Sequence, residues 1–235
     1  AFIGTNEEAQ KIPCEEKTDL QGRLLLPGLV DTHLHMLHYA FVERSVKLFD
    51  CKSVEEVLEA AHKRLEEHAG KPLTWLYCRG WNEEHFDEPR YPLKEELDAL
   101  SKEIPIIMVR VCGHVAVCNT PGLERLKKIP QFAEIAKDVD FETGLLKENA
   151  VQFSSSVLEA PSQEEVESYI VYSAKKLNEC GFTGVQSDDL ASLPGKNWKR
   201  IMNAYKALDA RGELNVRHYE QCLFERAEDA KAFIE

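Results

Sequence analysis

The sequence has no apolar run long enough to cross a membrane and no excess of positive charge. None of its uninterrupted apolar segments approaches the ~18 residues that indicate a transmembrane helix. Its 29 lysines and arginines are outnumbered by 41 aspartates and glutamates, which gives a formal net charge of −12. Nucleic acids and anionic membrane surfaces attract clusters of basic residues. The composition therefore argues against both as partners.

The sequence also lacks any Cys-x-x-Cys pair, although it contains seven cysteines. An odd number of scattered cysteines favours free thiols over a disulfide framework, and free thiols are typical of a reducing compartment. Hydrophobic residues make up 43% of the chain and charged residues 30%, as in folded globular proteins. We therefore expect a cytoplasmic, globular protein.

Strand-like and helix-like patterns alternate along the chain. Two capping boxes, Ser53 with Glu56 and Ser162 with Glu165, mark the starts of amphipathic helices. Strands are predicted at residues 29–35, 74–80, 106–111, 182–186 and 216–223, and helices at 53–68, 92–100, 162–180, 197–211 and 227–234. Residues 120–142 are irregular and highly charged. This alternation predicts an α/β protein with a parallel sheet.

Two histidines end the first predicted strand. Pro27 and Gly28 interrupt the chain just before it, so the strand has a defined start. Side chains alternate along a strand, so His33 and His35 are expected on one face. Neutral imidazole is a common ligand for zinc and similar metals. The pair could hold one ion, although two histidines near a strand end are also common without a metal.

The longer string around these histidines, residues 22–35 (Gly-Arg-Leu-Leu-Leu-Pro-Gly-Leu-Val-Asp-Thr-His-Leu-His), resembles the amidohydrolase superfamily of metal-dependent hydrolases. The segments 79–82, 110–114, 143–148 and 181–186 resemble the branch that holds N-substituted formamide deformylases and proteins labelled exoenzyme regulators. The resemblance implies a partial (β/α)8 TIM barrel of about five or six β/α units. Residues 1–26 would be the remnant of a small β-domain made of short strands, and residues 27–235 the N-terminal part of a truncated barrel.

The resemblance also implies the chemistry. His33, His35 and Glu148 would bind a divalent metal, with zinc as the expected ion and Lys147 as the alternative to Glu148. The metal would activate water to hydrolyse an amide-type C–N bond of a small molecule. No catalytic residue is expected within this chain, because the general-base aspartate would lie beyond Glu235. We therefore expect this chain alone to be inactive and to bind metal weakly or not at all. The alternative is a non-catalytic binding or regulatory module on a degenerate barrel.

Three residues near other strand ends are expected to contact the substrate. These are His114, which the resemblance places beside the substrate pocket, and Arg79 and Trp81, which lie at the end of the second predicted strand. Active sites of parallel barrels gather at the carboxyl ends of the strands. The alternative for His114 is a packing role. The alternative for Arg79 and Trp81 is to hold the loop after the strand in place.

Several acidic residues and one further histidine have open assignments. Asp31 is expected on the face of His33, either orienting the ligands or buried for structural reasons. Asp188 and Asp189 could reach the site or cap a loop. His218 shares its strand face with Glu220, and that face could be the barrel interior. The open sheet edges of a partial barrel also suggest a homo-oligomer.

Overall fold

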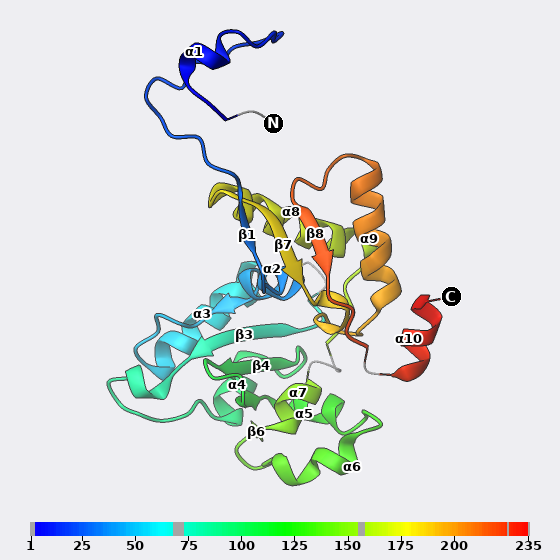
Figure 1. Ribbon diagram of the computed structural model, residues 1–235. Coiled ribbons are helices and arrows are strands. Elements are labelled where there is room, and N and C mark those ends of the chain that lie inside the picture. Colours follow the sequence, from blue (N-terminus) through cyan, green and yellow to red (C-terminus); the bar gives the residue numbers. More distant parts are fainter. Residues whose placement is uncertain (1–2, 68–72, 155–157, 225, 235) are drawn as a thin grey trace.

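Two separate β-sheets organise the chain in the computed structural model, which describes residues 3–67, 73–154, 158–224 and 226–234 (Figure 1). The first sheet is parallel and has the order β1-β7-β8. Its strands are β1 (Leu29–Asp31), β7 (Phe182–Ser187) and β8 (Arg217–Glu220). The strand that leads to the two histidines is therefore paired with a strand from the last quarter of the chain.

Three helices cover one face of this sheet and bury a shared apolar core. They are α2 (Met36–Glu43), α8 (Gln163–Glu179) and α9 (Trp198–Ala210). The Ser162 capping box is formed as predicted, because the Ser162 hydroxyl accepts from the backbone N–H of Glu165 and the Glu165 carboxylate accepts from that of Ser162. Residues on one face of α8, such as Ile170 and Ala174, are buried against the sheet.

The second sheet is mixed and has the order β2-β3-β4-β5-β6. Its strands are β2 (Val46–Lys47), β3 (Leu76–Trp81), β4 (Ile106–Arg110), β5 (Val115–Cys118) and β6 (Leu145–Lys147). The first three are parallel, and the last two add antiparallel. The surrounding helices are α3 (Val54–Glu67), α4 (Lys94–Leu100), α5 (Thr120–Leu126), α6 (Phe132–Ile135) and α7 (Asn149–Ser154). Short 3-10 turns lie at Glu83–His85, Ala136–Asp138 and Asp189–Ala191.

Asn119 fixes the connection between β5 and α5 from a fully buried position. Its amide oxygen accepts from the backbone N–H groups of Ile106 and Gly122, at 2.8 and 3.0 Å. Its amide nitrogen donates to the backbone carbonyls of Ser101 and Ile104, at 3.0 and 2.9 Å. One side chain thus caps α5 and holds the loop that precedes β4.

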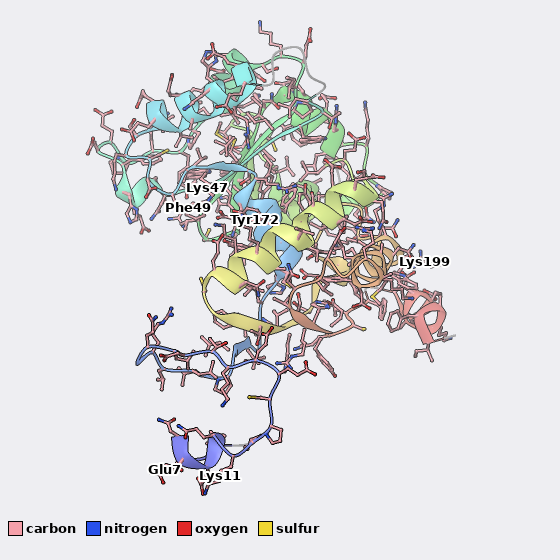
Figure 2. All side chains as sticks on the ribbon, turned by 90° about the horizontal axis from the view of Figure 1, so that it is seen from above. Glu7, Lys11, Lys47, Phe49, Tyr172 and Lys199 are labelled. Atoms are coloured by element: carbon pink, nitrogen blue, oxygen red, sulfur yellow. The ribbon has the colours of Figure 1, made fainter. Side chains whose placement is uncertain are left out.

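The N-terminal segment extends away from both sheets. Within residues 3–28 the regular structure is one short helix, α1 (Asn6–Ala9), so the short strands predicted for residues 1–26 are not formed there. Figure 2 shows Glu7 on this helix and Lys11 just after it, far from Tyr172 on α8. At the other end, α10 (Ala227–Ile234) packs through Phe233 onto Trp198 of α9. No helix in the described ranges has both the length and the apolar character needed to span a bilayer.

The structure confirms a mixed α/β fold with parallel strands, and it differs from the sequence prediction in how the strands are ordered. The strand predicted at 74–80 is present as β3, but it lies in the second sheet and is not a neighbour of β1. The sheet order therefore does not show the consecutive barrel units predicted after residue 27. β5, β6 and α2 were not predicted, because β5 and β6 are only four and three residues long and α2 follows the histidines directly.

Candidate functional site

The two histidines converge although the strand does not extend to them. β1 ends at Asp31, and the Asp31 carboxylate accepts a hydrogen bond from the backbone N–H of His33 at 3.0 Å. This local turn replaces the strand predicted to reach residue 35. The rings of His33 and His35 nevertheless lie edge to face with centroids 5.2 Å apart, and both residues are exposed. Two imidazoles therefore meet at the carboxyl end of a parallel strand.

An acidic residue from the neighbouring strand end contacts this pair. Asp188 follows β7, and its Oδ1 lies 2.5 Å from His35 Nδ1. The two atoms are close enough for an ion pair, but they are not aligned as a hydrogen bond, and Asp188 Oδ1 has no other aligned donor among the described residues. A carboxylate beside Nδ1 favours a proton on that nitrogen and leaves Nε2 free as a ligand atom.

Asp31 lies on the helix side of the sheet. It is paired in register with Val185, which is buried in the core under the helices. Together with Leu34 and Tyr39 it lines a shallow groove against α8. Strand alternation predicts Asp31 on the face of His33, but β1 ends at Asp31 and a turn follows, so that alternation does not extend to residue 33. Asp31 orients the backbone of His33 instead.

Glu148 is not gathered with the two histidines. Its carboxylate lies 3.1 Å from Nδ1 of His114, and both side chains are exposed at the edge of the second sheet. Lys147, at the end of β6, is exposed as well. In the parts of the chain that the structure describes, the one cluster of three or more potential metal ligands does not include His33, His35 or Glu148. The predicted set of three ligands is thus not assembled here.

Arg79 and Trp81 lie two positions apart on β3, on either side of a register shift, and have different surroundings. The pKa of His38 is lowered mainly by burial and next by the positive charge of Arg79. His35 acts in the same direction. Arg79 therefore lies on the side of β3 that faces the histidine-bearing segment. Trp81 is fully buried, and its indole N–H donates to the carbonyl of Met108 at 2.9 Å. This contact supports a packing role for Trp81 and not the substrate contact expected from the sequence.

The remaining candidates from the sequence form a buried cluster on the helix side of the first sheet. Asp189, His218 and Glu220 place potential ligand atoms within 4.8 Å of one another. Sequence reasoning correctly put His218 and Glu220 on one face, but that face is covered by helices. The grouping with Asp189 was missed, because it depends on the pairing of β7 with β8.

A parallel sheet with helices on one face and histidines at a strand end defines an α/β protein of the kind that binds ligands at its carboxyl edge. The amidohydrolase family model matches residues 16–234. The chain therefore belongs to the amidohydrolase family.

Two curated relatives illustrate the family. The chain is 31% identical over 199 residues to the putative amidohydrolase YtcJ of Bacillus subtilis, a match that covers 80% of this chain and 37% of that protein. It is 28% identical over 171 residues to the N-substituted formamide deformylase of Arthrobacter pascens, covering 66% of this chain and 30% of the relative. The chain thus spans about a third of the length of these relatives.

A solved structure has the same fold. An uncharacterised metal-dependent hydrolase from Pyrococcus horikoshii superposes with a TM-score of 0.67 at 23% identity, covering 88% of this chain and 38% of that one. At this level of identity the likeness describes the architecture, and the chemistry has to be argued from the residues.

Proposed function

We propose that this chain contributes the His33–His35 half-site of a metal-dependent hydrolase that cleaves an amide-type C–N bond of a small molecule. The observation that carries this proposal is the meeting of the two exposed imidazoles at the end of β1, with Asp188 against Nδ1 of His35. Membership of the amidohydrolase family supports it. The relative named as a formamide deformylase supports an amide-type substrate.

The donor set fits a divalent metal such as zinc. Zinc is bound by imidazole nitrogen, and a carboxylate commonly orients the ligand from its other ring nitrogen. His33 and His35 would hold the ion, and Asp188 would fix the orientation of His35. When bound, the ion would supply a hydroxide-like nucleophile near neutral pH and polarise the scissile carbonyl.

Residues of the second sheet would contribute to substrate binding. Arg79 would set a positive charge near the histidines, where it can orient a substrate carbonyl or carboxylate. Glu148 would bind the metal only if its side chain moved away from His114, since the two side chains lie 3.1 Å apart. Glu148 and His114 are both exposed, so this movement disturbs no buried packing.

The strand order supports a particular arrangement of the barrel. Neighbouring strands of a TIM barrel are parallel and follow one another in sequence, each separated by a helix. β7 and β8 obey this rule with α9 between them. β1, β7 and β8 would then be consecutive barrel strands, and the sheet β2–β6 would be an insertion after the first. Val30 and Tyr219 are exposed on β1 and β8, as expected for an inner face that further strands would close.

The test combines metal analysis with hydrolysis of a panel of N-substituted formamides and simple amides. His33→Asn with His35→Asn is expected to weaken zinc affinity at this site, and to lower any turnover that the parent protein shows, by more than about 100-fold, because both ligands are lost. His62→Asn is the matched control, since His62 lies on α3 and pairs only with the exposed Glu66 among the described residues. Unchanged zinc affinity at this site in the double variant would refute the proposal. Metal binding without turnover of any amide would favour a binding module.

A further inference from the structure

A second cluster of metal-ligating side chains lies inside the fold, apart from the exposed histidine pair. It consists of Asp189, just after β7, and of His218 and Glu220 on β8. Asp189 is fully buried, and the side chains of His218 and Glu220 are each 8% exposed. Such burial is unusual for ionisable groups unless they are paired or hold an ion.

Register places this cluster on the helix side of the sheet. His218 is paired with Val185 and Glu220 with Ser187, and both partners are buried. Val185 belongs to the core that α8 and α9 cover. His33 and His35 are exposed beyond the end of β1, so the buried cluster is a different site from the one proposed above. Figure 1 shows β7 and β8 side by side with α9 along them.

Half of the cluster's polar atoms are held firmly by the backbone. Glu220 Oε1 accepts from the N–H groups of Asp189 and Leu190, at 2.6 and 3.2 Å. Asp189 Oδ1 accepts from the N–H of Leu37 at 3.1 Å and from the hydroxyl of Ser192 at 3.0 Å. Asp189 Oδ2 accepts from the Ser187 hydroxyl. These contacts orient both carboxylates before any ion arrives, as the supporting contacts of metal sites do.

The other half of the cluster lacks aligned hydrogen bonds. Among the described residues, His218 Nε2, Glu220 Oε2 and the Tyr205 hydroxyl are buried without a hydrogen bond of adequate geometry, although Nε2 faces Oε2 and the Tyr205 hydroxyl faces Asp189. Nε2 and Oε2 lie 3.2 Å apart, and the Tyr205 ring stacks on His218 at 4.0 Å and so fixes its plane. Unpaired buried polar atoms are rare and costly, and several that converge indicate a group that binds between them.

Charge supports the same conclusion. Burial raises the pKa of Asp189, and burial together with the charge of Asp189 raises that of Glu220. Apart from His218, which lies against Glu220, the groups that reach the two carboxylates are backbone N–H groups and the hydroxyls of serines and of Tyr205, which carry no formal charge. His218 sets at most one positive charge against two negative ones. A divalent cation would balance the cluster, whereas it is under-compensated without one.

We propose that Asp189, His218 and Glu220 bind a divalent transition-metal ion, such as zinc, through His218 Nε2, Glu220 Oε2 and one Asp189 oxygen. One imidazole and two carboxylates are a ligand set for zinc, and the imidazole disfavours calcium and magnesium. The ion would join the ends of β7 and β8 to the start of α2, directly behind Asp188 and its contact with His35. This role is structural, and it does not depend on the proposed hydrolase activity.

A cavity borders one side of the cluster. His218 and Tyr205 line this cavity of about 780 Å³ beside β8, together with Lys206, Asp209 and Arg217, whereas Asp189 and Glu220 are not among its lining residues.

The test uses Co²⁺ as the probe, because its visible absorption reports coordination directly. The protein carrying His33→Asn and His35→Asn is expected to keep one tightly bound cobalt ion per chain, with the absorption of nitrogen and oxygen ligands. Adding either His218→Asn or Glu220→Gln is expected to weaken that binding by more than about 100-fold, because a ligand is lost. Tyr219→Phe is the matched control, because Tyr219 is exposed on the opposite face of the same strand, and it is expected to leave affinity unchanged.

Each outcome decides the inference. Absence of cobalt from the His33/His35 double variant would overturn it, and so would cobalt binding that neither substitution weakens. Should the β8 variants fail to fold, the stoichiometry and spectrum of the double variant still decide, because its buried cluster is intact. Thermal unfolding gives a second readout: added Zn²⁺ is expected to raise the melting temperature of the double variant. Failure of the hydrolase proposal would appear instead as absent turnover with this ion retained.

Discussion

Replacing Asp188 by asparagine tests how the exposed half-site is organised. The substitution keeps the size of the side chain and removes the negative charge that lies 2.5 Å from His35 Nδ1. Loss of a carboxylate that orients a metal-binding histidine typically weakens metal affinity by about 10- to 100-fold. That range corresponds to about 1.4–2.7 kcal/mol of binding free energy. We expect a loss of this size for Asp188→Asn.

The assay is a zinc titration against a chromophoric chelator, with His218→Asn present so that the exposed site is measured alone. Asp31→Asn is the matched control, because an asparagine oxygen can still accept from the His33 N–H as the Asp31 carboxylate does at 3.0 Å. Its zinc affinity is expected to stay at the value of the parent. Equal affinities for the Asp188 variant and the parent would refute the view that Asp188 orients a metal ligand.

Two further predictions concern the second sheet. Asn119→Asp keeps the accepted hydrogen bonds but removes both donors to the carbonyls of Ser101 and Ile104. Urea unfolding should therefore show a free energy of unfolding that is lower by about 2–5 kcal/mol. A decrease below about 1 kcal/mol would contradict this. Partial burial opposes ionisation of Cys112, but the N–H of His114 and the neighbouring guanidinium outweigh it and lower its pKa. Iodoacetamide should therefore alkylate Cys112 at lower pH than Cys222, whose pKa burial raises; the reverse order, read by peptide mass spectrometry, would exclude this.

Local features of the sequence were enough to find most of the regular elements. The helix predicted at 162–180 is observed as Gln163–Glu179, because the capping box and the apolar periodicity both act within a few residues. The apolar run predicted at 106–111 is the strand Ile106–Arg110 for a similar reason, since it is buried on both faces. The N-terminal strands failed because residues 3–28 pack on neither sheet, so an extended pattern there gains no partner.

The site was predicted in part. The spacing of His33 and His35 was enough to expect their rings together, but the turn at Asp31 that brings them there was not foreseen. Glu148 was chosen by resemblance, and its observed partner is His114, which the β5–β6 pairing brings beside it. Side-chain neighbours across strands depend on register, which a single sequence does not display.

The sequence by itself determined the family, the boundaries of the longer helices α3, α8 and α9, and the identity of the paired histidines, because each depends on residues close together along the chain. Only the tertiary structure decided which strands are neighbours. Leu37 and Asp189 are joined by a hydrogen bond although 152 positions separate them. Backbone groups are chemically alike in every strand, so pairing is chosen by how whole faces pack. That choice separated the two sheets and enclosed Asp189, His218 and Glu220 in one buried cluster.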